Sequence, residues 1–237
     1  MSIETNLNLI EARIAEACMR SGRRREDLTL IGVSKKQPVG SIRAALEMTT
    51  LRDFGENYVQ EYVTKREQLS KEIAEYGAKF HFIGHLQRNK VRQLMSQPPA
   101  MIHSVDSPEL VLQINKVSTE VALEARQKIV VELRIGDEDG EKTGLSPECL
   151  PTMIETIDDC RQLHWVGLMI IPPLGSCAED SRPYFREVRG LFDKINSRRT
   201  EKLTVLSYGM SDDFEVAIEE GATHLRIGTA IFGARKS

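Results

Sequence analysis

The chain has 237 residues, of which 41% are hydrophobic and 28% are charged, and its formal net charge is -3. This balance is typical of a globular protein and provides no bulk attraction to nucleic acid or to anionic lipid. No stretch approaches the roughly 20 apolar residues of a membrane span, and the amino terminus lacks the basic and apolar segments of a secretion signal. We therefore expect a cytoplasmic protein that binds neither nucleic acid nor membrane.

The four cysteines are scattered along the chain and form no CxxC pair, so they predict neither a zinc site nor a disulfide framework. This usage is typical of a reducing compartment. The cysteines are Cys18, Cys149, Cys160 and Cys177.

A first helix is predicted over residues 5–20, where apolar residues recur at helical spacing. Short runs rich in Val, Ile and Leu follow, with amphipathic segments between them. Helix starts are indicated by Pro38, Ser107-Pro108-Glu109 and Ser146-Pro147-Glu148. Eight strands are expected, at residues 28–34, 51–55, 80–84, 101–105, 129–135, 164–170, 203–207 and 224–227.

Strictly alternating strands and helices imply a parallel sheet, and eight right-handed units close into a barrel of about 250 residues. An open doubly wound sheet is the alternative, but it would favour a GxGxxG turn after the first strand, which Val33 to Pro38 does not contain. We therefore predict a single (β/α)8 TIM barrel over residues 1–237, in which residues 1–26 form an amino-terminal helical extension.

In such a barrel the functional site lies at the carboxyl ends of the strands. The first strand ends in Ser34-Lys35-Lys36. Because neighbouring side chains of a strand point to opposite faces, one lysine can enter the barrel mouth, and the spacing leaves open which one. A lysine among apolar neighbours has more of its neutral amine available to attack a carbonyl. Two solvent-facing lysines are the alternative interpretation.

A phosphate cradle is predicted where the seventh and eighth strands end. Small hydroxyl residues and glycine in the segment 207–213, followed by a helix start, suit an anion. The segment 226–229 adds a second small-residue turn, and barrels often build phosphate sites from these two loops. We expect Asp212 to form a capping box with Glu215, which leaves the backbone amides and Ser207 for a ligand.

Other residues at the mouth are Asn57, His85 and Met169, none of which has a partner at the spacing of a catalytic triad or a metal site. The acidic loop of residues 136–144 resembles a calcium loop only loosely, because it lacks the alternating ligands and the distal glutamate. We interpret it as a mobile loop over the barrel mouth and predict no metal.

Six motifs together resemble the pyridoxal phosphate homeostasis protein family, whose fold is similar to the amino-terminal barrel of alanine racemase. The likeness runs from about the first strand to the carboxyl terminus. The motifs are Val33-Ser34-Lys35, Phe54 to Glu61, His81 to Gly84 with Leu86-Gln87 and Asn89-Lys90, Gly167-Leu168-Met169, Gly209 to Asp213, and Arg226 to Gly233.

This resemblance implies that Lys35, rather than Lys36, holds pyridoxal 5'-phosphate as a Schiff base. Asn57 and Met169 would line the pocket, and Arg226 would approach the pyridine nitrogen, making the ring a weak electron sink. The residues implied to surround the phosphate are Ser207, Gly209, Met210, Ser211, Gly228 and Thr229. Departures from the family pattern are Arg88, Thr143 and Tyr208, which bear on loop contacts and partner surfaces.

The resemblance implies a cofactor carrier or regulator without rapid catalysis. We expect a monomer whose partners include apo forms of pyridoxal phosphate enzymes. A racemase-like enzyme is the alternative. Racemases that resemble this barrel draw a tyrosine base from an additional domain, and we expect none here, since the chain stops about ten residues past the eighth strand. A Schiff-base aldolase is disfavoured because residues 164–170 contain no lysine.

Overall fold

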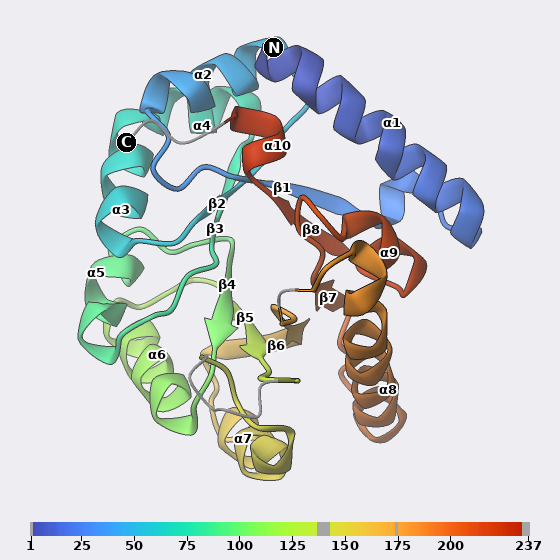
Figure 1. Cartoon of the computed structure of the whole chain (residues 1–237). Coiled ribbons are helices and arrows are strands. Elements are labelled where there is room, and N and C mark those ends of the chain that lie inside the picture. Colours follow the sequence, from blue (N-terminus) through green and yellow to red (C-terminus); the bar gives the residue numbers. More distant parts are fainter. Residues whose placement is uncertain (1, 137–142, 174, 234–237) are drawn as a thin grey trace.

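Eight parallel strands close a barrel in chain order, with the helices on its outside (Figure 1). The structure is a computed structural model that describes residues 2–136, 143–173 and 175–233. The predicted barrel is confirmed, and each strand lies within three residues of its expected bounds. The strands are β1 (Thr29–Val33), β2 (Asp53–Glu56), β3 (Lys79–Phe82), β4 (Met101–Val105), β5 (Gln127–Glu132), β6 (Leu163–Met169), β7 (Val205–Ser207) and β8 (His224–Ile227).

The helices start largely where the proline signals place them. Pro38 precedes α2, and Pro108 is the first residue of α6, whereas Pro147 opens a short 3-10 turn before α7. The helices are α1 (Ile3–Ser21), α2 (Val39–Met48), α3 (Val59–Gln68), α4 (Ser70–Tyr76), α5 (Val91–Met95), α6 (Pro108–Glu120), α7 (Leu150–Asp158), α8 (Arg182–Arg198), α9 (Phe214–Glu219) and α10 (Thr229–Phe232).

Helix α1 lies outside the barrel and packs against α9 and α10 (Figure 1). The Ser2 hydroxyl accepts the Thr5 backbone N–H at its start, and Gly22, in the left-handed region, ends it. The apolar face that the sequence predicts is buried, through Leu7, Ile10, Ile14 and Ala17. The helix therefore supports the two elements that follow β7 and β8.

The interior of the barrel divides into an apolar cluster and a set of buried polar side chains. The apolar cluster consists of Met101, Val130, Val166, Met169 and Val205. The polar set, which comes from other positions on the strands, includes His81, His103, Ser207 and Arg226. Buried polar groups need hydrogen-bond partners. Members of the polar set meet this need by bonding to one another, as His103 and Arg226 do with Ser207.

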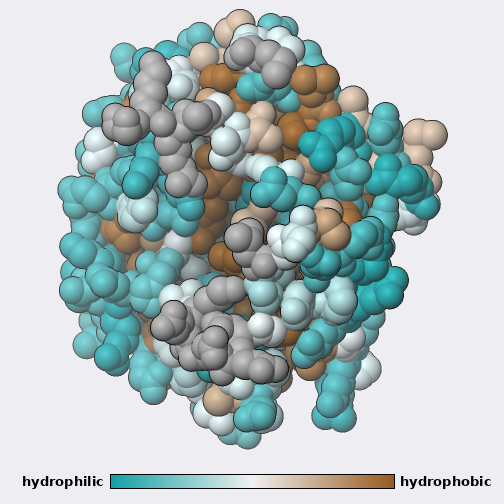
Figure 2. Space-filling view, in the orientation of Figure 1, coloured by the Kyte–Doolittle hydropathy of each residue, from teal (hydrophilic) through white to brown (hydrophobic). Residues whose placement is uncertain are grey.

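The outer surface over the helices is mostly hydrophilic, and apolar surface shows toward the centre of the face in Figure 2. Among the described residues, no helix is long and apolar enough to cross a membrane.

Strand β6 approaches β7 closely at Gly167, which pairs with Val205 in the register of the sheet. A Cβ atom at Gly167 would collide with the carbonyl oxygen and side chain of Val205. A residue larger than glycine here must push β6 and β7 apart. Gly190 on α8 has open space at the same position.

We therefore expect Gly167→Ala to lower the free energy of unfolding by about 1–3 kcal/mol, as overpacking of a core does. Gly190→Ala is the matched control and should raise that free energy by about 0.5–1 kcal/mol, since alanine is the better helix former. Denaturant unfolding followed by circular dichroism measures both. Equal stability of the Gly167→Ala variant and the parent would contradict this account of strand packing.

Candidate functional site

A cavity of about 430 Å³ lies at the carboxyl ends of the strands. Seven of the residues predicted for the site line it. These are Lys35, Asn57, Met210, Ser211, Arg226, Gly228 and Thr229, and the remaining lining comes from Val33, Gln37, Ile83, Ile171, Asp212 and Gly233.

The structure separates the two adjacent lysines. Lys35 lines the cavity, whereas Lys36 is exposed and adopts a left-handed backbone conformation with φ 59°. The chain leaves the barrel at this point, so alternation of faces stops at Lys36. Lys35 is therefore the lysine whose amine can meet a ligand in the cavity.

The backbone on both sides of Lys35 is held by a buried ionic cluster. The ammonium of Lys65 donates to the Ser34 carbonyl at 2.7 Å and to carboxylates of Glu56 and Glu61, each at 2.8 Å. The Ser34 hydroxyl donates to Glu56 at 2.6 Å, and the Lys36 N–H donates to Glu61 at 2.8 Å. All three donors of the ammonium are used, so the segment that carries Lys35 has little freedom to shift.

Two buried oxygens beside this cluster have no hydrogen-bond partner among the described residues. They are Oδ1 of Asn57, in the cavity lining, and Oε2 of Glu56. Burial raises the pKa of Glu56, although Lys65 and Ser34 oppose the shift. An unpartnered buried oxygen is costly unless a ligand or water supplies a donor. Asn57 therefore offers an acceptor to whatever occupies the cavity.

Arg226 forms part of the cavity lining from inside β8. One guanidinium nitrogen, NH1, donates to the carbonyl and hydroxyl of Ser207 at 2.6 and 2.8 Å, and NH2 donates to the Ile170 carbonyl at 3.0 Å. These three bonds leave two of the five N–H donors of an arginine. Burial lowers the pKa of Arg226 to about 10, which still leaves the group cationic at neutral pH.

Hydroxyl groups available to an anion come from the loops after β7 and β8. Within the residues that the structure describes, the Ser211 and Thr229 hydroxyls make no hydrogen bond, and both residues line the cavity. Gly209 precedes Ser211 in the left-handed region, with φ 94°, where a Cβ atom would meet Ala217. This glycine lets the turn pass close to α9.

The predicted capping box between Asp212 and Glu215 is wrong. Asp213, rather than Asp212, accepts the Met210 backbone N–H at 2.7 Å, and its other oxygen accepts the Ser181 hydroxyl at 3.0 Å. Glu215 instead forms ion pairs with arginines of α1. The helix begins one residue later than expected, so Asp212 is left in the cavity lining.

Three predicted site residues lie outside the cavity lining. Ser207 is fully buried in the barrel, where its hydroxyl contacts Arg226 and His103. Met169 belongs to the apolar cluster of the interior, and Gly209 is absent from the residues that line the cavity. The part of the acidic loop at 137–142 lies outside the described residues.

His85 and Tyr208 have local structural partners. His85 is half exposed, pairs with Asp106 at 3.2 Å, and lines a neighbouring hollow. Tyr208 is buried, stacks on Phe185, and donates its hydroxyl to the Glu220 carbonyl at 2.8 Å. Tyr208 is therefore a buried packing residue beside the turn at Gly209 and is not part of the cavity lining.

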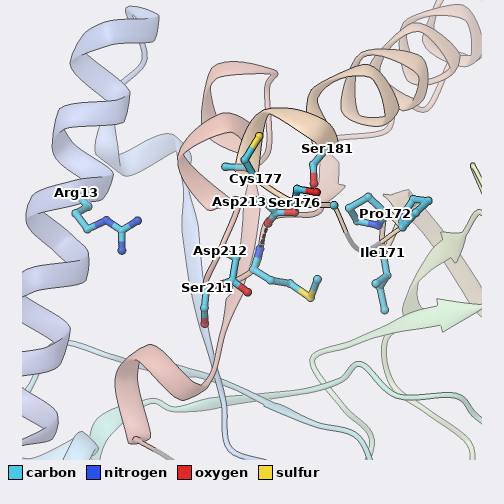
Figure 3. A pocket seen from close by; sticks show the side chains of 13 residues that line it. Arg13, Ile171, Pro172, Ser176, Cys177, Ser181, Ser211, Asp212 and Asp213 are labelled. Carbon is cyan, nitrogen blue, oxygen red and sulfur yellow. Dashed lines mark hydrogen bonds between the residues drawn. The ribbon is translucent and has the colours of Figure 1, made fainter.

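A wider hollow of about 780 Å³ adjoins the cavity and shares Ile171, Met210, Ser211 and Asp212 with it. Figure 3 shows Arg13 of α1 on one side of this hollow and Ile171 and Pro172 on the other. The cavity can therefore be approached past the Ser211 turn.

Sequence reasoning missed the ionic cluster around Lys65 and the buried histidines. The i,i+4 spacing of Glu61 and Lys65 was a visible signal for an ion pair, but nothing in it marks Lys65 as buried. The alternation Met101-Ile102-His103 could have placed His103 inside the barrel, since it shares a face with Met101.

The lining suits a small aldehyde that carries a phosphate. An amine at Lys35 can form an imine, the two hydroxyls and the loop backbone can bind an anion, and Arg226 can donate to a ring nitrogen. The unpartnered oxygen of Asn57 adds one acceptor.

Comparison with known proteins shows the family to which the chain belongs. The family model "Alanine racemase, N-terminal domain" matches residues 6–236. A pyridoxal phosphate homeostasis protein of Aquifex aeolicus is 41% identical over 230 residues, covering 97% of each chain. The protein of that name from Escherichia coli K12 is 35% identical and covers 98% of this chain and 97% of its own. PipY of Synechococcus elongatus, solved with PLP bound, is 30% identical with a TM-score of 0.83, over 98% of this chain and 100% of PipY.

These matches extend over nearly the whole chain, and they confirm the resemblance seen in the motifs. The chain belongs to the pyridoxal phosphate homeostasis protein family, within the larger family defined by the alanine racemase N-terminal domain.

Proposed function

We propose that this protein binds pyridoxal 5'-phosphate as a Schiff base on Lys35 and serves the intracellular homeostasis of that cofactor. The observation that carries the proposal is the meeting of Lys35, Arg226, Ser211 and Thr229 in one cavity. Relatives named pyridoxal phosphate homeostasis protein, and PipY with PLP bound, support the choice of cofactor.

The orientation of the cofactor follows from the same residues. The phosphate would lie against Ser211, Gly228 and Thr229, the aldehyde carbon would face Lys35, and the ring nitrogen would face Arg226. Asn57 would accept a hydrogen bond from the ring substituents. Ser207 would act on the ring side, through Arg226, because its hydroxyl is bonded to that guanidinium.

We infer that the protein acts by binding rather than by turnover. A guanidinium at the ring nitrogen disfavours protonation there, and an unprotonated ring withdraws electrons weakly from a bound amino acid. Among the described residues that line the cavity, Asp212 is the one titratable side chain besides Lys35 and Arg226. A racemase-like enzyme would need acid and base groups on both faces of the substrate.

Delivery of the cofactor to apo forms of pyridoxal phosphate enzymes is the partner role that we propose. The wider hollow beside the Ser211 turn gives such a partner or a small amine a route to the cavity. A monomer in the cytoplasm remains the expected state.

The first prediction from this proposed function concerns Lys35. Wild-type protein loaded with pyridoxal phosphate should be yellow, and Lys35→Ala should lose both the colour and the capture of the cofactor by borohydride, because Lys35 is the one lysine among the described residues that line the cavity. Lys36→Ala, the neighbouring control, should keep both. Absorption spectra and intact mass before and after reduction measure them. Cofactor trapped at the wild-type level in Lys35→Ala would refute the assignment.

The second prediction concerns the phosphate. Ser211→Ala and Thr229→Val should each weaken binding of pyridoxal phosphate by about 1.5–3 kcal/mol, the range for a hydrogen bond to a charged group. Thr156→Val on α7 is the control and should bind as wild type does. Fluorescence titration gives the affinities. If pyridoxal without its phosphate bound as tightly as the phosphorylated form, the phosphate site would lie elsewhere.

The third prediction concerns turnover. Prolonged incubation of the loaded protein with L-alanine or L-serine should produce no more D-isomer or keto acid than the Lys35→Ala control. Chiral chromatography of the amino acids provides the measurement. Sustained conversion by the wild type alone would place the protein among racemase-like enzymes instead.

A further inference from the structure

A chain of hydrogen bonds crosses the barrel interior from Asp53 to the cavity. Asp53 is the first residue of β2, at the amino-terminal end of the barrel, and its Oδ1 lies 2.9 Å from Nε2 of His81. Nδ1 of His81 lies 3.0 Å from Nε2 of His103. Nδ1 of His103 lies 2.9 Å from the Ser207 hydroxyl, which accepts from Arg226 at 2.8 Å.

The chemistry of the residues at its two ends determines which atom donates in each bond of this hydrogen-bond chain. The Asp53 carboxylate can only accept, so Nε2 of His81 carries the proton that it accepts. In a neutral imidazole the other nitrogen then accepts, which makes His103 the donor at its own Nε2. Nδ1 of His103 must accept in turn, so the Ser207 hydroxyl donates to it and keeps its lone pairs for Arg226.

Burial agrees with a neutral imidazole at His103, in the middle of these hydrogen bonds. His103 is fully buried, and burial together with the neighbouring His81, His224 and Arg226 holds its pKa well below the ordinary value. The ring centroid of His224 lies 6.4 Å from that of His81 and 6.0 Å from that of His103. Its Nδ1 bonds to Thr223, so His224 is not part of the hydrogen-bond chain. The described residues contain no cluster of His, Cys, Asp and Glu placed to hold a metal ion, so hydrogen bonding is the role that this arrangement supports.

We propose that Asp53 is a positioning residue for the cavity, although it lies at the opposite end of the barrel. Acting through the two histidines, it sets the direction of the Ser207 hydroxyl. That hydroxyl and two carbonyls then fix the guanidinium of Arg226, so that its two remaining donors are held in one orientation. The donor–acceptor order of the hydrogen-bond chain does not depend on any ligand, whereas its effect on the cofactor rests on the proposed function.

Replacing Asp53 with asparagine tests the donor–acceptor order with little change of shape. An amide can donate to His81 as well as accept from it, so Asp53→Asn should release the tautomers of both histidines. Long-range proton–nitrogen NMR of the cofactor-free protein reads them, with assignments from single histidine substitutions. We expect the Nε2–H tautomer for both His81 and His103 in the wild type, and a second population with Nδ1–H in Asp53→Asn.

Glu201→Gln is the matched control. Glu201 pairs with His164 at 3.3 Å on the surface, so this variant changes a carboxylate–histidine pair that is not part of the hydrogen-bond chain. The tautomers of His81 and His103 should stay as in the wild type. If wild-type His103 carried its proton on Nδ1, or if Asp53→Asn left both tautomers unchanged, the proposal would be overturned.

The second readout is the cofactor. Asp53→Asn should weaken the affinity for pyridoxal phosphate by about 2- to 30-fold and shift the pH midpoint of its absorption bands, as loss of a coupled contact does. Ser207→Ala cuts the same chain next to Arg226 and should shift the midpoint in the same direction. Unchanged midpoints in both variants would overturn the positioning role. A wild type that binds no pyridoxal phosphate would instead refute the proposed function, and the NMR result would still decide the donor–acceptor order of the hydrogen-bond chain.

Discussion

The buried guanidinium of Arg226 is the constraint on which much of this structure depends. A cation in the interior of a barrel is unfavourable unless its donors are bonded and its charge is balanced. The Ser207 and Ile170 carbonyls supply two acceptors, and Glu132, itself buried, favours the charged form of Arg226 electrostatically. The half of the interior near Arg226 must therefore be polar, while the apolar cluster fills the remainder. A barrel filled only with aliphatic residues could not keep a cation beside the cavity.

A second charged cluster holds the end of β1, the strand that pairs with β8 beside Arg226. Lys65 is 5% exposed, and its ammonium joins the end of β1 to β2 and α3 through Ser34, Glu56 and Glu61. Removing either partner of such a buried pair leaves an uncompensated charge, so the cluster makes the position of Lys35 depend on three elements at once. The backbone that carries Lys35 and the guanidinium of Arg226 are thus held by separate networks on neighbouring strands. A ligand that needs both must match the distance that the barrel sets between them.

The sequence was sufficient for the barrel because its evidence is local. Apolar runs, proline starts and the length of the chain predict eight units, and the strands of the structure follow them. Seven of the site residues predicted from the motifs also line one cavity. Long-range partners could not be derived in this way. Whether Ser207 faces the cavity or Arg226 depends on His103, 104 residues away in the chain, and the choice between Asp212 and Asp213 at the turn depends on Ser181. Side-chain alternation predicts which face of a strand a residue is on. Its hydrogen-bond partner on that face is determined only when the barrel has folded.

The closure of the barrel and the candidate site use the same residues. Strands β7 and β8 pair at one position, Ser207 with His224, so few ladder bonds join them. Other contacts replace the ladder: the Arg226 N–H donates to the Gly209 carbonyl at 2.9 Å, and the Arg226 side chain bonds to Ser207. Helix α1 covers this junction from outside by packing on α9 and α10, the elements that follow the two strands. Because the turns after β7 and β8 carry Ser211 and Thr229, an anion bound there would join two loops that the sheet itself connects weakly, so binding and closure of the barrel should stabilise one another.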